Sequence, residues 1–300
     1  MSEAECLALV QAHRLARLSL DEGFGPTARW EPEPVTIRLG GVAVPLPEGA
    51  FLQATADGEA ALVAAMLEAV GPAEHTADLF AGLGTFALAL PGAVLAAEGA
   101  RDAILALAGA ANRAGRHVKA EHRDLFRRPL TAKELAGFDA VVLDPPRAGA
   151  KEQVIELAAS GVPRIAYVSC NPTTFARDAR ELVTTLLTRY GATVTPTSSC
   201  EEALIALTDA AACERFDVIV SDIGLPGEDG YSLVRKVREL TPALGGAIPA
   251  VALTAYGRSV DRVKALSAGF QMHVPKPVEP VELAMVITSL TRRASIDTVA

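Results

Sequence analysis

Cys170 is a candidate nucleophile because of its position in the chain. It follows a short apolar run that includes Tyr167 and Val168, and it precedes a turn at Asn171 and Pro172, after which a helix is expected. A thiol at the carboxyl end of a strand, facing a helix N-terminus, lies where the helix dipole stabilises the reactive thiolate. Such a thiolate is suited to covalent catalysis. The alternative is a buried structural cysteine, the commoner fate of a lone thiol.

A glycine-rich loop and two later acidic residues form a second candidate site. Gly82 and Gly84 follow an apolar run that ends near Asp78, and they let backbone N–H groups approach a ligand closely. Glu98 ends the next predicted strand, where a carboxylate can accept both hydroxyls of a ribose. Asp124 follows the third strand and is a candidate partner for an adenine amino group, with a turn-forming aspartate as the alternative.

Strands and helices alternate through the first half of the chain, and this alternation positions both sites. Helices are predicted over 1–20, 59–70, after Gly84, 101–114, 151–159 and 173–190, and strands over 76–80, 93–97, 117–121, 138–143 and 164–169, with short strands between 27 and 51. The pattern predicts a doubly wound, Rossmann-like α/β sheet that binds ligands at the carboxyl ends of its strands.

A second α/β pattern follows residue 190. Strands are predicted over 192–196, 216–221, 250–253 and 271–274, and helices begin near Glu201, Gly230, Val260 and Pro280. The domain limits that we expect are 1–50 for an N-terminal α+β remnant, 51–177 for the first sheet and 178–300 for the second.

The composition argues against several classes of protein. Half of the 300 residues are hydrophobic, enough to form a core in two domains, and the net charge of −8 argues against a bulk binder of polyanions. The four cysteines lack C-x-x-C spacing, which argues against a disulfide framework, a zinc site or an iron–sulfur cluster. No leader and no apolar stretch of membrane-spanning length is recognisable, so we expect a cytoplasmic protein without a membrane partner.

One local segment is basic. Its members are Arg113, Arg116, His117, Lys119, His122, Arg123, Arg127 and Arg128. They can contact RNA phosphates, or they can form a solvated helix end and strand edge. We expect no DNA partner.

Three motifs together resemble the RNA (uracil-5-)-methyltransferase family. They are the loop from Asp78 to Phe86, the turn Asp144-Pro145-Pro146-Arg147 and the segment Ser169-Cys170-Asn171-Pro172. The resemblance covers residues 51–180 and implies S-adenosylmethionine as the cofactor and uracil in RNA as the substrate. It also implies cofactor contacts from Gln53, Phe80, Thr85, Glu98 and Asp144. Ala81 stands where many relatives have Cys, and Ala54 and Thr85 stand where relatives have Asn.

The resemblance also implies a covalent reaction. Carbon 5 of uracil is a poor nucleophile, so the thiolate of Cys170 first adds to carbon 6, and the resulting enolate takes the methyl group at carbon 5. The target base has to leave its stack to enter such a site.

The final step of this reaction needs a general base that the chain lacks in recognisable form. The family uses a Glu in a segment well after the nucleophile to remove the proton from carbon 5. Here that segment is replaced, and Glu279 and Glu282 are only superficially similar. We therefore expect impaired turnover that stalls at the covalent stage. The N-terminal RNA-binding barrel of many relatives is not recognisable either, so we expect weak affinity for RNA.

The second pattern resembles a response-regulator receiver domain, which has a flavodoxin-like sheet. Asp222 matches the phosphoacceptor, Thr254 the hydroxyl switch residue, Tyr256 lies near the aromatic switch position, and Lys276 matches the lysine that pairs with the acyl phosphate. The resemblance implies a signalling protein as partner. A receiver has the strand order 2-1-3-4-5, and its first strand ends in two acids that hold Mg²⁺.

That first strand is missing here. Thr174 and Phe175 stand where the two acids belong, and neither binds a metal. We therefore expect very slow phosphate transfer to Asp222. The predicted strand over 164–169 is positioned to fill the gap, but it is also expected to pair with the strand that ends at Asp144. It cannot serve both sheets, so one of them must be rearranged or incomplete.

Three functions remain open from the sequence. The first is a remnant RNA uracil-C5 methyltransferase fused to a partial receiver. The second is a phosphorelay receiver or interaction protein without enzymatic activity, in which the first half is a scaffold. The third is a recombined reading frame without a selected function.

Overall fold

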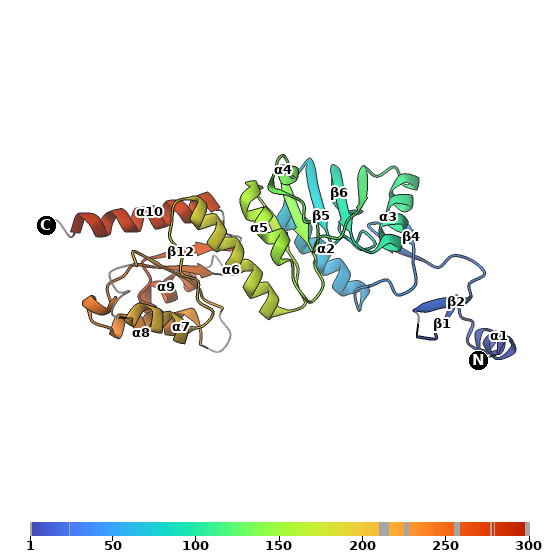
Figure 1. The fold of residues 1–300 in the computed structure, drawn as a ribbon, viewed down its shortest axis with the longest axis horizontal. Helices are drawn as coiled ribbons and strands as arrows, with labels where there is room; N and C mark the ends of the chain where they lie inside the picture. Colours follow the sequence, from blue (N-terminus) through green and yellow to red (C-terminus); the bar gives the residue numbers. More distant parts are fainter. Residues whose placement is uncertain are drawn as a thin grey trace. The chain divides into compact units, whose positions relative to one another are not determined.

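The computed structural model describes residues 2–23, 25–209, 216–224, 228–254, 259–276, 278 and 280–297 (Figure 1). The chain divides into two compact units, Met1–Thr185 and Leu186–Ala300. The boundary falls inside one continuous helix, α6 (Pro172–Arg189). No helix among the described residues is long and apolar enough to cross a membrane.

The first unit is built on a five-stranded parallel sheet with the order β7-β6-β5-β8-β9. The strands are β5 (His75–Leu79), β6 (Ala93–Glu98), β7 (Val118–His122), β8 (Ala140–Leu143) and β9 (Ile165–Tyr167). The order reverses beside β5, so the carboxyl ends of β5 and its two neighbours surround a switch point, where ligands bind in such sheets. The prediction of a doubly wound α/β sheet is confirmed.

Helices cover both faces of this sheet. They are α2 (Ala56–Val70), α3 (Arg101–Arg113), the short α4 (Ala132–Leu135) and α5 (Lys151–Ser160), besides the first part of α6. Side chains alternate along β8: Val142 packs in one apolar cluster with Leu107 of α3, and Val141 packs in the other with Leu157 of α5. Because successive side chains of a strand point to opposite faces, the two clusters are two separate core layers.

The N-terminal region differs from its prediction. Helix α1 spans Glu3–His13, not 1–20, and it ends at Arg14, whose φ of 49° is left-handed. Residues Leu18–Asp21 then form β1, which pairs antiparallel with β2 (Pro26–Trp30). A second hairpin joins β3 (Thr36–Leu39) to β4 (Val42–Pro45). Pairing with β2 satisfies the backbone of Leu18–Asp21, so helix continuation there is not favoured.

The helix predicted after Gly84 is also absent, since residues 82–89 form consecutive turns. Oδ2 of the buried Asp78 accepts a hydrogen bond of 2.8 Å from the backbone N–H of Ala87. In an α-helix that N–H would donate to the carbonyl of Leu83. The side chain therefore replaces one link of the helical ladder.

The second unit holds a three-stranded parallel sheet, β10-β11-β12, among its described residues. Its strands are β10 (Ile219–Asp222), β11 (Ala250–Thr254) and β12 (Met272–Pro275). Its helices are α7 (Cys200–Thr208), α8 (Gly230–Glu239), a 3₁₀ turn at Pro242–Leu244, α9 (Ser259–Ala268) and α10 (Pro280–Asp297).

The strand predicted over 192–196 does not form. In the receiver order that strand pairs only with the missing first strand, so its backbone has no ladder to join. Strand β9 pairs with β8 of the first sheet. The second sheet is therefore the incomplete one.

Candidate functional site

The loop after β5 is joined to the end of β6 through Glu98. The backbone N–H of Gly82 donates to Oε2 of Glu98 at 2.9 Å, and the N–H of Ala100 donates to Oε1 at 2.6 Å. A carboxylate oxygen has two lone pairs, so Glu98 can still accept ribose hydroxyls. A Cβ at Gly84 would collide with Leu107, whereas one at Gly82 would meet no atom within 4 Å. The backbone at Gly82 is thus open to a ligand.

One fully buried and one partly buried aspartate lie at the carboxyl ends of β5 and β8. Asp78 is fully buried, and burial raises its pKa to about 8, with a further rise from the charges of Asp144 and Glu98. Its Oδ1 atom has no hydrogen-bond partner among the described residues. Burial also raises the pKa of Asp144, at the end of β8, to about 6. Burial is the main cause of the raised pKa of Asp78, because it disfavours the charged carboxylate, and the neighbouring negative charges act in the same direction.

The loop after β7 carries Asp124 and an aromatic side chain. Oδ1 of Asp124 accepts bonds from the N–H groups of Phe126 (3.0 Å) and Arg127 (3.3 Å). This is the turn-forming role that we considered as the alternative for Asp124, and its remaining oxygen interacts with Arg127 at 3.5 Å. The ring of Phe126 lies 5.4 Å from that of Phe80.

Cys170, the candidate nucleophile, lies on the loop after β9, which is hydrogen-bonded to the turn after β8. Cys170 is exposed. A nucleophile has to be accessible to its substrate, whereas the alternative, a structural cysteine, would be buried. The Asn171 side chain donates to the carbonyl of Arg147 at 3.1 Å, and the Thr174 hydroxyl donates to the same carbonyl at 3.2 Å. The turn after β8 and the loop after β9 therefore form one surface.

The structure thus brings together only part of the predicted site. Gly82 and Glu98 are in direct contact, and Asp78 and Asp144 lie close enough to interact electrostatically. Gln53 is partly buried two residues before Thr55, the N-cap of α2, and Thr85 is partly buried in the turns after Gly84. Sequence reasoning missed Phe126, although an aromatic residue beside a strand-end aspartate was a visible signal.

S-adenosylmethionine fits the residues at this edge. The open backbone at Gly82, the carboxylate of Glu98 and the exposed aromatic ring of Phe126 match the cofactor's polar and aromatic parts. The buried and unpartnered Oδ1 of Asp78 lies next to this loop.

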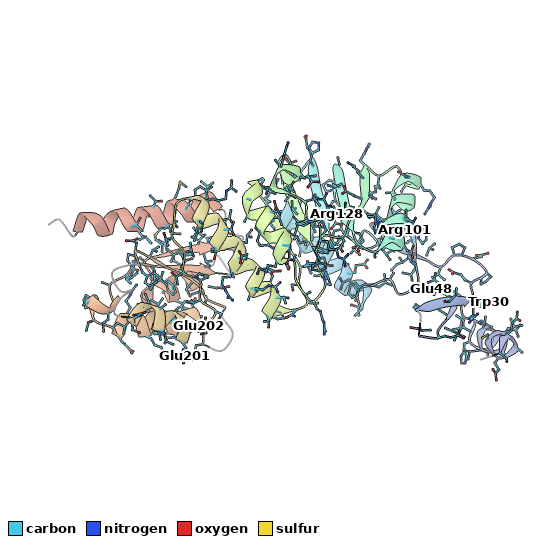
Figure 2. The ribbon with its side chains drawn as sticks, viewed as in Figure 1. Trp30, Glu48, Arg101, Arg128, Glu201 and Glu202 are labelled. Atoms are coloured by element: carbon cyan, nitrogen blue, oxygen red, sulfur yellow. The ribbon has the colours of Figure 1, made fainter. Side chains whose placement is uncertain are left out.

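The basic segment is partly occupied by contacts within the unit. Arg123 forms ion pairs with Glu134 (2.7 Å) and Glu121 (3.2 Å), and it holds the pKa of Glu134 at about 2. Arg116 donates to the carbonyl of Gly40 at 3.1 Å. Arg128 is exposed on the loop after β7 (Figure 2). Arg123, whose side chain is only 12% exposed, and Arg116 are therefore held by contacts within the unit.

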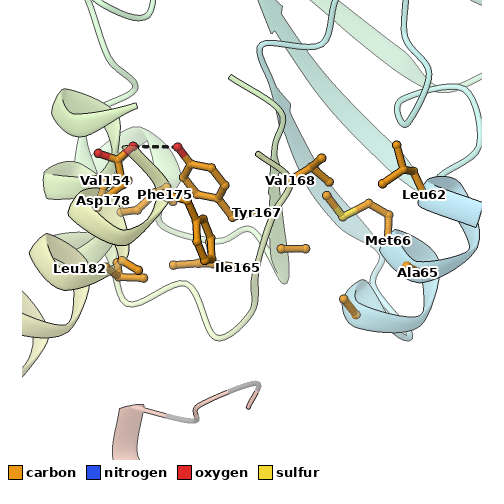
Figure 3. Close-up of a pocket in the computed structure, with 14 residues that line it drawn as sticks. Leu62, Ala65, Met66, Val154, Ile165, Tyr167, Val168, Phe175, Asp178 and Leu182 are labelled. Atoms are coloured by element: carbon orange, nitrogen blue, oxygen red, sulfur yellow. Dashed lines mark hydrogen bonds between the residues drawn. The ribbon is translucent and has the colours of Figure 1, made fainter. Parts of the chain in front are cut away.

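An apolar pocket of about 370 Å³ lies beside the edge strand β9 (Figure 3). Leu62 and Met66 of α2 line one side, and Phe175 and Leu182 of α6 line the other. The Tyr167 hydroxyl donates to Oδ2 of Asp178 at 2.7 Å on its wall. This carboxylate is completely buried in the first unit, although the predicted second domain begins at residue 178.

The second unit contains its own cluster at the ends of its strands. Asp222 ends β10, and Nζ of Lys276, just after β12, lies 2.5 Å from its Oδ2 atom. Thr254 is buried at the end of β11 between them in the sheet order. Across the described ranges no three His, Cys, Asp or Glu residues gather as a metal site. Tyr256 and Glu279 lie outside the described residues, and Glu282 lies in the first turn of α10.

Thr174 and Phe175 are engaged in the first unit. The Thr174 hydroxyl bonds to Arg147, and the ring of Phe175 lies 5.3 Å from that of Tyr167. Thr174 therefore holds the loop of Cys170 against the turn at Arg147, whereas Phe175 packs against Tyr167 in the apolar pocket.

Two family models match the chain. The model described as tRNA (Uracil-5-)-methyltransferase matches residues 42–192, and the response regulator receiver domain matches residues 176–288. The two matches overlap along α6, the helix that crosses the boundary between the units.

Curated relatives resemble the first unit. An uncharacterized RNA methyltransferase of Zymomonas mobilis is 61% identical over 170 residues, which are 56% of this chain and 43% of the relative. A 23S rRNA (uracil(1939)-C(5))-methyltransferase RlmD of Pseudomonas fluorescens is 47% identical over 143 residues, 45% of this chain and 31% of the relative. The chain thus spans less than half the length of these relatives.

Solved structures resemble each unit separately. A tRNA (uracil-54, C5)-methyltransferase of Pyrococcus abyssi, in complex with S-adenosyl-L-homocysteine, is 29% identical with a TM-score of 0.45, over 51% of this chain and 38% of that one. The receiver domain of a sensor histidine kinase of Pseudomonas aeruginosa is 29% identical with a TM-score of 0.33, over 37% of this chain and 85% of that one.

Proposed function

Because the chain belongs to the tRNA (uracil-5-)-methyltransferase family and carries a response regulator receiver domain, we propose that its first unit binds S-adenosylmethionine and attacks uracil in RNA through Cys170. The observation that carries this proposal is the alignment of strand ends. The loops of β6, β5, β8 and β9 open at one edge of a parallel sheet, and they present Glu98, Gly82, Asp144 and the exposed Cys170.

The residues of this edge have distinct roles in the proposal. Cys170 adds its thiolate to carbon 6 of the uracil, which moves an electron pair to the C4 carbonyl as an enolate. Asn171 and Thr174 hold the nucleophile loop against the turn after Asp144 through the Arg147 carbonyl. The cofactor supplies the methyl group that carbon 5 takes. Glu98, with two backbone N–H bonds fixing its orientation, is the proposed acceptor for the ribose hydroxyls.

Release of the product requires a base that removes the proton from carbon 5, so that the electron pair of that C–H bond expels the thiolate. Asp144 is half-buried and its raised pKa suits proton exchange near neutrality, but it follows β8 and no contact ties it to the Cys170 side chain. Glu282 lies in the second unit. We therefore expect the reaction to stop with the RNA attached to Cys170.

A covalent trapping experiment tests the proposal. The full chain is incubated with a labelled uridine-containing RNA fragment and S-adenosylmethionine, and denaturing electrophoresis is used to detect protein joined to RNA. We expect a shifted band that depends on the cofactor, disappears in Cys170→Ala and persists in Cys200→Ala, since Cys200 is buried in the other unit. No band with a folded, cofactor-binding protein would contradict the assigned nucleophile. Release of free 5-methyluridine over many turnovers would contradict the stalled reaction.

The second unit favours a role in protein interaction over phosphate transfer. Asp222 and Lys276 form the ion pair expected of a receiver site, but the described residues hold no cluster of three His, Cys, Asp or Glu side chains that could bind Mg²⁺. We propose that this unit contacts a signalling protein and that RNA is bound weakly by the first unit. We also propose a cytoplasmic location and a domain limit near residue 178.

A further inference from the structure

Phe126 presents an aromatic face at the edge that holds Glu98. Phe126 is 41% exposed, whereas the preceding Leu125 is buried. The loop itself is fixed, because Leu125 is buried in the core and Asp124 accepts the N–H of Phe126. The exposed ring is therefore held in a defined position.

The ring of Phe80 contacts that of Phe126. Phe80 packs against the core layer of Leu79 and Leu157, and its ring meets that of Phe126 at a tilt of 55°. Its backbone φ is 62°, a left-handed conformation that costs energy for a bulky residue other than glycine. Such strain is typical of ligand sites, where the surrounding structure compensates for it. Two independent observations, the strained Phe80 and the exposed Phe126, thus coincide.

The aromatic pair adjoins the groups proposed for the ribose. The backbone N–H of Arg123, three residues before Phe126, donates to the carbonyl of Glu98 at 2.8 Å. Gly82, two residues after Phe80, donates to the side chain of Glu98. Both aromatic residues are therefore connected through short loops to Glu98, one through its backbone carbonyl and the other through its carboxylate.

We propose that Phe126 is the stacking platform for the adenine ring of the cofactor and that Phe80 positions it. This inference rests on the proposed function. Adenine is the part of S-adenosylmethionine with an apolar aromatic face, and an exposed phenylalanine offers no hydrogen bond to the ribose or amino-acid parts. Stacking on an aromatic side chain favours a base by about 1–3 kcal/mol, which corresponds to roughly a 5- to 150-fold change in affinity.

Calorimetric titration of the full chain with S-adenosylhomocysteine tests the stack without requiring activity. We expect Phe126→Ala and Phe126→Leu to weaken binding about tenfold and Phe126→Trp to retain it, because only an aromatic ring stacks. The affinity for adenosine alone should fall by the same factor in Phe126→Ala. Phe175→Ala is the matched control: Phe175 is 39% exposed and also contacts a second aromatic ring, but on α6. It should leave the affinity unchanged.

The outcomes separate this inference from the function on which it rests. Binding by the wild type with unchanged affinity in Phe126→Leu would overturn the stack and leave the proposed function standing. The stack would also be overturned, with the proposed function left standing, if Phe175→Ala weakened binding as much as Phe126→Ala does. No binding by a folded wild type would overturn both. If circular dichroism shows that Phe126→Ala does not fold, the comparison of the affinities of Phe126→Leu and Phe126→Trp decides whether the ring stacks.

Discussion

The hydroxyl of Tyr167 donates a hydrogen bond of 2.7 Å to Oδ2 of Asp178, a carboxylate with no exposed surface. The same oxygen accepts the backbone N–H of Ala150 at 2.6 Å, and Oδ1 accepts from Arg177. Asp178 therefore ties the start of α6 to strand β9 and to the start of α5. Burial and this bond raise the pKa of Tyr167 above its usual value.

Tyr167→Phe removes this bond while keeping the ring. We expect it to lower the free energy of unfolding by about 1–3 kcal/mol, because a buried carboxylate loses one of its donors. Urea denaturation followed by circular dichroism measures the change. Tyr190→Phe is the control, since Tyr190 is 55% exposed, and it should change stability by less than about 0.5 kcal/mol. Equal effects of the two variants would contradict the role of Asp178.

Asp78 makes stability depend on pH. Its folded-state pKa of about 8 exceeds the ordinary value of 3.8, so the folded protein holds a proton that the unfolded chain has lost. Stability from this group is full below the ordinary value and is lost as the pH rises through about 8. The pKa of Asp144 is raised to about 6, so this group also makes the folded protein less stable as the pH rises, over a narrower pH range.

Asp78→Asn cannot ionise, so it should reduce the loss of stability between pH 5 and pH 8 relative to the wild type. Its amide oxygen can still accept the N–H of Ala87. Urea midpoints measured across this range give the comparison. Asp57→Asn, an exposed residue at the start of α2, is the control and should follow the wild-type curve. Parallel curves for Asp78→Asn and the wild type would show that Asp78 is ionised in the folded protein.

Glu98→Ala should weaken the binding of S-adenosylhomocysteine by about 1–3 kcal/mol, through loss of an acceptor for ribose hydroxyls and of the bond that fixes Gly82. Glu98→Gln should lose less, because an amide oxygen still accepts. Isothermal calorimetry compares both with Glu68→Ala, an exposed position on α2. Unchanged affinity in Glu98→Ala would remove this carboxylate from the proposed cofactor site.

Asp222 should not accumulate phosphate from acetyl phosphate and Mg²⁺. A divalent ion that neutralises the phosphate is needed for the transfer, and the described part of the second unit offers no acidic cluster to hold one. Intact-mass spectrometry detects the addition directly. A stable gain of one phosphate that disappears in Asp222→Ala, but not in Asp217→Ala, would show that another group supplies the metal site.

The arrangement of the strand ends around the candidate site was predictable because its signals are local. The alternation of strands and helices, the glycines at positions 82 and 84 and the acids at strand ends are all readable within short windows. Parallel strands then bring their carboxyl ends to one edge, so that Glu98 and Gly82 are expected to meet, as they do at 2.9 Å. The limits of α3 and α5 were predicted to within one residue from apolar periodicity and turn residues, whereas α2 begins at Ala56, three residues before its predicted start.

Other features depended on partners distant in the chain. The sequence by itself determined an extended tendency at 164–169 and at 192–196, but only the tertiary structure decided that β9 joins β8 and that 192–196 joins no sheet. Only the tertiary structure, likewise, decided that Asp78 accepts the N–H of Ala87 and that Asp178 is buried against Tyr167. A strand or a buried carboxylate is stable only when another segment satisfies its hydrogen bonds, and local sequence does not specify which segment will do so.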